Sequence, residues 1–264
     1  VCPTDMATTC VTGGTAGIGL AFARSFAARG DDLVLVARDA GRLRAVADEL
    51  AAAHGVRVEC LVADLSDRAD AQRVADRVED AARPVDTLVN NAGFSVGATL
   101  LDPGMTRHDA ASEVMMRTVV LLQGAAGRAM KARGRGTIIN VASIAGFITQ
   151  GHYSAIKAYV VALTESLAVE LRGTGVRVCV LCPGYVRTEF HARAGIAGSS
   201  IPGPFWMDAD ALVAACLADV ARGKVISVPT ARWATIHAVL RHAPRPLVRR
   251  LSGLLSSARR NETQ

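Results

Sequence analysis

Three side chains suited to proton exchange lie close together between residues 143 and 157. Ser143 ends an apolar, strand-like run, and Tyr153 and Lys157 are four residues apart, so a helix would place them on one face. A phenol has an ordinary pKa of about 10 and is a poor acid or base near neutrality. A neighbouring ammonium would lower that pKa, so that the Tyr153 hydroxyl exchanges a proton with an alcohol or ketone while Ser143 donates to the same oxygen. The spacing therefore predicts an acid–base centre.

A glycine-rich turn, TGGTAGIG at 12–19, lies between the first strand-like run and the first helical pattern. In this context Gly13 permits a tight turn, Gly17 lets the backbone approach a pyrophosphate, and Gly19 lets helix and strand pack closely. The helix N-terminus supplies N–H groups and a positive dipole end. The segment predicts a dinucleotide-binding site.

The end of the second strand-like run indicates which nicotinamide cofactor is bound. NAD sites usually carry an acid there, but this sequence has Ala37 followed by Arg38, whose guanidinium suits a 2′-phosphate. Asp39 is predicted to cap the next helix. NADP(H) is therefore favoured over NAD(H). Asp64, after the third run, has two interpretations, an acceptor for the adenine amino group or a turn-forming aspartate.

Apolar runs alternate with amphipathic stretches along the chain. Strands are predicted at 8–12, 32–37, 57–62, 86–90, 136–142, 175–182 and 225–228, and helices at 18–29, 40–53, 67–81, 106–132, 152–172 and 208–221. This order predicts an α/β fold, a single-domain Rossmann-type doubly wound parallel sheet of about seven strands with helices on both faces. The dinucleotide-binding and catalytic domain is predicted to span 1–230, with a substrate lid loop at 183–207, followed by a basic amphipathic tail at 231–264.

The composition limits the class of protein further. The 264 residues are 50% hydrophobic and 20% charged, which favours a folded domain over disorder. With no 18-residue apolar stretch and no leader pattern before the first strand, we expect a cytoplasmic protein. Cys179-x-x-Cys182 has metal-ligand spacing but is interpreted as two buried thiols on different faces of a strand, so no metal site is predicted.

The motifs TGGTAGIG, NNAG at 90–93, NVASIAG, YSAIK and PGYVRTEF at 183–190 together resemble the short-chain dehydrogenase/reductase family, in its NADP-preferring type, over residues 7–230. In that family the tyrosine exchanges the proton, the lysine also holds the nicotinamide ribose, and the serine orients the carbonyl. These roles fall on Tyr153, Lys157 and Ser143. The cofactor-binding residues derived above or implied by the resemblance are Gly13, Thr15, Gly17, Ile18, Gly19, Arg38, Asp64, Leu65, Asn90, Ala92, Gly93, Tyr153, Lys157, Pro183, Gly184, Val186 and Thr188. The resemblance also implies a homo-oligomer, a dimer or tetramer.

Two positions depart from the family pattern. The family's catalytic asparagine, in the helix before the fifth strand, is Met115 here, and a thioether cannot replace an amide. Met115 is alternatively a core residue, with the asparagine's role taken by a backbone carbonyl or absent. The loop between Ser143 and Tyr153 is shorter than in most members, which we interpret as altered specificity before lost activity.

The function predicted is an NADP(H)-dependent oxidoreductase that interconverts a ketone or aldehyde and an alcohol by hydride transfer. Phe205, Trp206 and Met207 in the lid suggest an apolar substrate. Because of Met115 and the short loop, the alternative is a weakly active or inactive NADP-binding sensor or interaction protein.

The tail carries most of the basic charge. Residues 222–264 hold nine basic groups and one acid, Glu262. Pro244 and Pro246 are predicted to separate two short amphipathic helices, with one apolar side formed by Leu247, Val248, Leu251, Leu254 and Leu255. Packing on its own domain or a neighbouring subunit is the first interpretation, and peripheral contact with an anionic membrane is the second. Nucleic-acid binding is last, because no recognition motif accompanies the charge.

Overall fold

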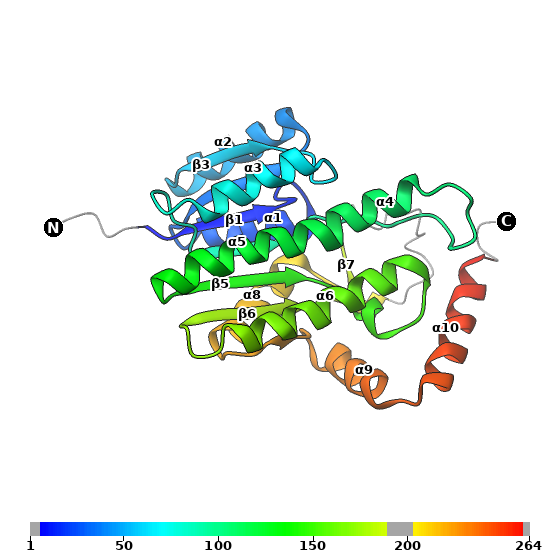
Figure 1. The fold of residues 1–264 in the computed structure, drawn as a ribbon. Helices are drawn as coiled ribbons and strands as arrows, with labels where there is room; N and C mark the ends of the chain where they lie inside the picture. The colour runs from blue at the N-terminus through cyan, green and yellow to red at the C-terminus, as the bar shows by residue number, and fades with distance from the viewer. Residues whose placement is uncertain (1–5, 189–202, 261–264) are drawn as a thin grey trace.

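Seven parallel strands form the central sheet of the computed structural model, which describes residues 6–188 and 203–260 (Figure 1). They are β1 (Thr8–Thr12), β2 (Asp32–Ala37), β3 (Val58–Val62), β4 (Thr87–Asn90), β5 (Gly136–Val141), β6 (Val176–Leu181) and β9 (Ile226–Ser227). Their order, β3-β2-β1-β4-β5-β6-β9, reverses direction between β1 and β4, so the carboxyl edge there is the expected ligand site. The predicted doubly wound sheet is confirmed.

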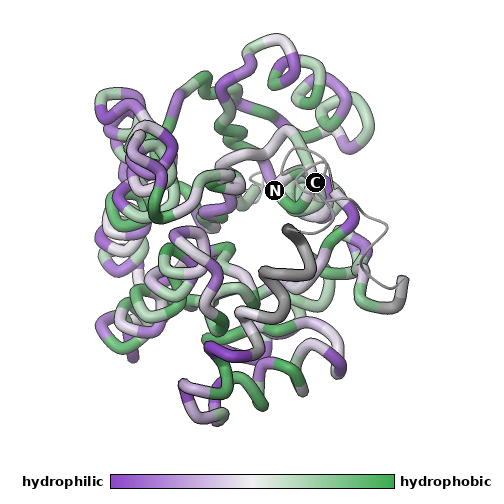
Figure 2. The backbone as a smooth tube through the Cα atoms, turned by 90° about the vertical axis from the view of Figure 1, so that its right-hand side faces the viewer, coloured by the Kyte–Doolittle hydropathy of each residue, from purple (hydrophilic) through white to green (hydrophobic). Residues whose placement is uncertain are grey.

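Helices cover both faces of the sheet. They are α1 (Gly17–Ala27), α2 (Ala40–His54), α3 (Arg68–Glu79), α4 (Thr106–Ser112), α5 (Thr118–Arg133), α6 (Gly151–Glu170) and α8 (Ala209–Ala221). Figure 1 shows α3, α5 and α6 on the side of the sheet nearer the viewer, with α1 and α8 behind it. Two hydrophobic clusters fill the layers, because the central strands carry buried apolar residues that face both sides of the sheet. The loops after the strands converge on the carboxyl edge, onto which Figure 2 looks.

Aspartates begin several of these helices. Asp39 caps α2, its carboxylate accepting from Arg42 N at 3.0 Å, which confirms the predicted cap. Asp67 and Asp208 cap α3 and α8 in the same way. A carboxylate at this position satisfies free N–H groups and interacts favourably with the helix dipole.

The predicted continuous helix over 106–132 is wrong in one respect. A π-helical segment, η1 (Glu113–Arg117), separates α4 from α5, and Thr118 N donates to Glu113 O across it. A π turn holds one more residue than an α turn, which changes the face that the flanking helices present. Val114 and Met115 are thereby both buried.

The tail forms two helices, α9 (Ala231–His242) and α10 (Arg245–Arg260), as predicted. Figure 1 shows both beyond α6, on the carboxyl-edge side. Val248 is fully buried but Leu247 is 48% exposed, so the prediction of one apolar side is wrong for Leu247. The side chains of Leu251, Leu254 and Leu255 lie outside the described residues. Within the described ranges, no helix has the length and apolar character needed to cross a membrane.

Candidate active site

The glycine-rich turn is held in a conformation that side chains would obstruct. Gly13 and Gly17 have φ of 66° and 52°. A Cβ on Gly19 would lie 2.2 Å from Gly13 O and 2.4 Å from Asn91 Nδ2. The start of α1 therefore packs directly on the turn, with its N–H groups at the carboxyl edge. Ile18 packs against the core beneath.

Asn91, a residue that the sequence did not single out, fastens this turn to β4. Its Nδ2 donates to Thr12 O at 2.9 Å and to Gly13 O at 3.3 Å. Thr12 Oγ1 accepts from Asn91 N and Ala92 N, both at 3.0 Å. The motif NNAG marks this position in the sequence, but only the structure shows that Asn90 and Asn91 have different roles.

Asn90 supports the sheet interior. Its Nδ2 donates to Asn140 Oδ1 at 2.9 Å on β5, and Asn140 Nδ2 donates to Gln123 and Thr164 at 2.8 and 2.9 Å. All four side chains are buried, so the hydrogen bonds compensate for the loss of water. This network fixes β4 and β5 to α5 and α6, and the acid–base centre lies at the end of β5 and the start of α6.

Ser143, Tyr153 and Lys157 meet at the ends of β5 and α6. Ser143 and Tyr153 share a hydrogen bond. Lys157 is 5% exposed, its Nζ donates to Val141 O at 2.9 Å, and the same atom lies 5.5 Å from the centroid of the Tyr153 ring. The three residues predicted from their spacing are therefore neighbours in space.

Burial dominates the protonation of this centre. It raises the pKa of Tyr153 to about 12, with the Ser143 hydrogen bond acting in the opposite direction, and it lowers the pKa of Lys157 to about 8. The prediction that Lys157 lowers the tyrosine pKa is thus wrong for the protein without ligands. Tyr153 is a neutral hydroxyl at pH 7, which suits a proton donor.

Basic side chains gather where β2 and β3 end. Two hydrogen bonds from Ser66 lower the pKa of Asp64, and the charge of the exposed Arg38 side chain lowers it further. Asp64 therefore does form a turn, with Oδ1 accepting from Ser66 N at 2.9 Å and Oγ at 2.7 Å. Arg42, which the sequence did not single out, donates from Nε to Thr15 O at 3.1 Å. One guanidinium group, that of Arg42, thus contacts the glycine-rich turn, and that of Arg38 is exposed at the end of β2.

The segment that follows β6, residues 183–188, contacts both the glycine-rich turn and the C-terminal tail. Pro183 O accepts from Ile144 N at 3.0 Å, and Thr188 lies against Gly17, where a Cβ would be 3.2 Å away. Val186 is buried in β7 (Tyr185–Val186), which pairs with β8 (Trp206–Met207). A Cβ on Gly184 would lie 2.0 Å from the Trp233 ring of α9.

The tail contacts the loop before α6 as well. His237 packs edge-on against Phe147 in the 3₁₀ turn η2 (Ile144–Phe147), with ring centroids 4.4 Å apart. Thr149 N donates to Ser252 Oγ of α10 at 3.1 Å. The first interpretation of the tail, packing on its own domain, is what these contacts show. The short loop between Ser143 and Tyr153 is covered by the chain's own C-terminal helices.

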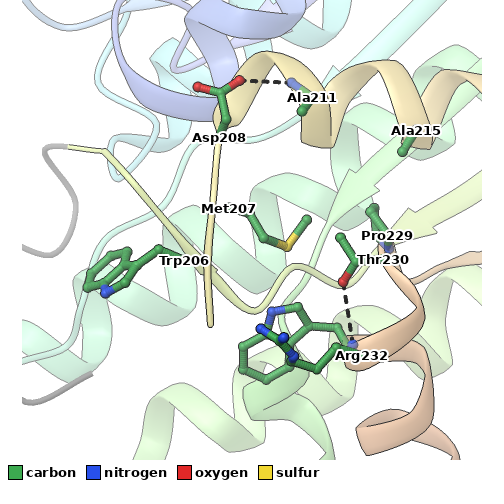
Figure 3. A pocket seen from close by; sticks show the side chains of 9 residues that line it. Trp206, Met207, Asp208, Ala211, Ala215, Pro229, Thr230 and Arg232 are labelled. Atoms are coloured by element: carbon green, nitrogen blue, oxygen red, sulfur yellow. Dashed lines mark hydrogen bonds between the residues drawn. The ribbon is translucent and has the colours of Figure 1, made fainter. Parts of the chain in front are cut away.

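A cavity of about 330 Å³ lies between the tail and α8 (Figure 3). Residues of β8, the start of α8 and the segment before α9 line it: Trp206, Met207, Asp208, Ala211, Ala215, Pro229, Thr230, Arg232 and Trp233. Ser143, Tyr153 and Lys157 do not line it. The cavity is thus separate from the acid–base centre.

Comparison with known proteins identifies the family of the chain. Residues 7–196 match the family described as short chain dehydrogenase. The chain belongs to the short-chain dehydrogenase family. It is an oxidoreductase of the kind that acts on alcohols and ketones, and its fold is that family's Rossmann-type sheet.

Three similar proteins illustrate the range of this short-chain dehydrogenase family. A galactitol 2-dehydrogenase (L-tagatose-forming) of Cereibacter sphaeroides is 40% identical over 194 residues, 72% of this chain and 75% of that protein. A short-chain dehydrogenase from Sphingobium yanoikuyae in complex with NADPH is 34% identical, with a TM-score of 0.82 over 89% of this chain and 94% of that one. A bulky-bulky ketone specific alcohol dehydrogenase from Comamonas testosteroni is 26% identical, with a TM-score of 0.78 over 92% and 96%.

Met115 lies at the centre of this short-chain dehydrogenase. It is 1% exposed within η1, and a Cβ on Gly93 would lie 3.0 Å from its Sδ. Leu65 is also a predicted cofactor-binding residue. Its carbonyl oxygen accepts a hydrogen bond from Thr118 Oγ1, just after η1, at 3.0 Å. The thioether fills the space beside Gly93, as the core interpretation expects.

Cys179 and Cys182 are both buried in one hydrophobic cluster. Among the described residues, no group of three or more His, Cys, Asp or Glu side chains is arranged to hold a metal ion.

Proposed function

We propose that this protein is an NADP(H)-dependent oxidoreductase that interconverts a ketone or aldehyde and an alcohol. The observation that carries the proposal is the Ser143–Tyr153 hydrogen bond beside buried Lys157, at the carboxyl edge next to the glycine-rich turn. Tyr153 would donate its proton to the carbonyl oxygen that Ser143 holds. When bound, NADPH supplies the hydride.

The residues of the turn fit a dinucleotide. A Cβ on Gly13, Gly17 or Gly19 would lie 3.2 Å or less from neighbouring protein atoms, so these glycines keep the turn compact, and the start of α1 directs its N–H groups to the carboxyl edge. Lys157 would bind the nicotinamide ribose, and the segment from Pro183 to Thr188 would lie beside the nicotinamide. The NADPH complex of the Sphingobium relative supports this site.

Arg38 and Arg42 favour the phosphorylated cofactor. Asp39 is engaged in capping α2, so the acid closest to Ala37 in sequence is not directed at a ribose. A 2′-phosphate would accept charge-assisted hydrogen bonds from both guanidinium groups. The cofactor proposed is therefore NADP(H).

Arg38→Ala should weaken the binding of NADPH without affecting the binding of NADH. Loss of one charge-assisted hydrogen bond, worth about 1.5–3 kcal/mol, is expected to raise the KM for NADPH about 10- to 100-fold. Steady-state kinetics with both cofactors measures the ratio. Arg44→Ala, at an exposed arginine on α2, is the control and should leave both KM values unchanged. Equal losses for NADPH and NADH in Arg38→Ala would contradict the assignment.

Gly19→Ala should disrupt cofactor binding through the backbone. The new Cβ would lie 2.2 Å from Gly13 O, so the turn must shift, with an expected destabilisation of about 1–3 kcal/mol and about a tenfold or greater loss of NADPH affinity. Gly41→Ala is the matched control, because its Cβ would meet Asp39 Oδ1 at an ordinary 3.5 Å and alanine favours helix. Thermal unfolding and fluorescence titration with NADPH measure both effects; wild-type affinity in Gly19→Ala would refute the packing argument.

The substrate class remains an apolar ketone in our proposal. Phe205, Trp206 and Trp233 form an aromatic cluster with Tyr185 at the segment after β6. The Comamonas relative, specific for bulky-bulky ketones, supports this class, whereas the galactitol relative acts on a polyol. The homo-oligomer, the lid function and peripheral membrane contact through the exposed arginines of α10 remain predictions.

The experiment that tests the function is NADPH oxidation with a panel of bulky aromatic and alicyclic ketones, aldehydes and ketoses. Turnover with at least one apolar ketone, faster than with ketoses, is expected. NADPH binding without turnover on any member would favour the alternative, a cofactor-binding sensor.

A further inference from the structure

Two histidines that are 44 residues apart in sequence form a hydrogen bond beside Tyr153. His108 on α4 and His152 in the first turn of α6 bring their Nδ1 atoms to 2.9 Å, with ring centroids 4.9 Å apart and planes at 43°. His108 is 5% exposed and His152 is half-buried. Neither has a role in the chemistry proposed above.

The remaining contacts fix where the hydrogens lie. His108 Nε2 lies 3.1 Å from Thr99 O, which only accepts, so this nitrogen carries a hydrogen. Ser112 Oγ donates to His108 O at 2.9 Å, so it can only accept from His152 Nε2 at 3.5 Å. With both rings neutral, His108 Nδ1 is the acceptor and His152 Nδ1 the donor for the shorter contact, and His152 Nε2 then has no hydrogen to give to Ser112 Oγ.

The pair tolerates one extra proton but not two. A singly charged pair has three N–H groups, which satisfy the Nδ1 contact, Thr99 O and Ser112 Oγ together. With both rings charged, both Nδ1 atoms carry hydrogens and the 2.9 Å contact is lost to repulsion. Burial and the charge of His108 lower the pKa of His152, which opposes the second proton.

The charged and titratable groups on the surrounding elements do not replace this contact. Asp102, in the loop before α4, accepts from Thr99 N at 2.9 Å, and Glu113 pairs with Arg68. Other groups on these elements include Arg107 and Asp109 on α4, Tyr153, Lys157, Tyr159, Glu165 and Glu170 on α6, and Arg245, Arg249 and Arg250 on α10. The charge that lowers the pKa of His152 is that of His108.

The start of α6 depends on few other restraints. Gln150 provides no side-chain cap, although its N–H donates to Ser154 Oγ at 3.2 Å. Thr149 is held by Ser252 of the tail. The histidine pair is therefore the shorter of two described side-chain contacts that join this turn to α4, the other being Ser112 Oγ to His152 Nε2 at 3.5 Å, and Tyr153 is the next residue.

We propose that His108 and His152 are positioning residues, which share a proton and hold Tyr153 at the substrate, so that turnover fails in acid when the pair becomes doubly charged. The proposal rests on the proposed function. Neither side chain transfers a proton to the substrate.

The test compares two substitutions of His152 over a range of pH. Asn places an uncharged N–H donor near the position of Nδ1, so His152→Asn should keep kcat at neutral pH within about threefold and lose the acid limb below pH of about 6. His152→Leu removes the donor, and kcat should fall about 10- to 100-fold at every pH with little change in KM for NADPH. His54→Leu, at the exposed end of α2, is the control and should match the wild type.

An acid limb unchanged in His152→Asn, or a wild-type kcat in His152→Leu, would overturn the proposal while leaving the proposed function intact. Imidazole ¹⁵N shifts give a readout that does not require turnover. At pH 8 they should show hydrogen on Nε2 of His108 and on Nδ1 of His152; any other tautomer pair would overturn the geometry. Absence of turnover in the wild type, with these tautomers present, would count against the oxidoreductase function alone.

Discussion

Tyr153→Phe is expected to lower kcat for ketone reduction about 10²- to 10⁴-fold, because the variant has no proton to give to the developing alkoxide. NADPH affinity should change less than about threefold, since the ring and Lys157 remain. Tyr159→Phe, at another half-buried tyrosine on α6, is the matched control and should retain wild-type turnover. Steady-state NADPH oxidation and equilibrium titration measure the two quantities.

Equal activity of Tyr153→Phe and wild type would place proton transfer on another group. A parallel loss of NADPH affinity would instead show that the phenol supports the cofactor. The two outcomes are distinguished by the titration.

Lys157→Met should abolish turnover and yet stabilise the ligand-free protein. Burial lowers the Lys157 pKa from 10.5 to about 8, so near neutrality the native state holds a buried ammonium that costs about 3 kcal/mol relative to the unfolded chain. The variant leaves Val141 O without its donor, which costs about 1 kcal/mol. We expect the free energy of unfolding to rise by about 2 kcal/mol at pH 7.

The pH dependence of the free energy of unfolding tests whether the buried ammonium of Lys157 causes the difference in stability. Between pH 8 and 10.5 the unfolded chain binds more protons at this lysine than the native state, so wild-type stability should rise with pH there and the advantage of the variant should shrink. Lys131→Met, at an exposed lysine on α5, should change stability by less than about 0.5 kcal/mol. Urea unfolding at pH 7 and 10 measures the difference; a variant less stable than wild type at pH 7 would contradict the argument.

The sequence was sufficient for the fold because most strands are short apolar runs and several helices begin at a capping residue, such as Asp39. Tyr153 and Lys157 were recognisable because helical spacing alone places them together. The histidine pair was not recognisable, because residues 108 and 152 meet only through the packing of α4 on α6. Arg42 was missed for a similar reason, since its contact with Thr15 O crosses from α2 to the glycine-rich turn.

The protonation state of Tyr153 could not be predicted from the sequence either. The motif places an ammonium one turn from a phenol, but the sign of the pKa shift depends on how deeply both are buried. In the structure desolvation exceeds the effect of the Ser143 hydrogen bond, so the pKa of Tyr153 is raised and the hydroxyl stays protonated. Likewise η1 follows from a hydrogen bond between Glu113 and Thr118 that apolar periodicity does not encode.

The π turn makes the residue count of the helix spanning 106–133 a determinant of the site. One residue removed between 113 and 117 would restore a continuous α-helix, with a rotation of α4 relative to α5 of about 100° and a displacement of about 1.5 Å. The backbone would be more regular, but His108 would turn away from His152. A deletion in this segment would therefore have two opposite effects. It would make the local helix more regular, and it would misalign the surface against which α6 packs.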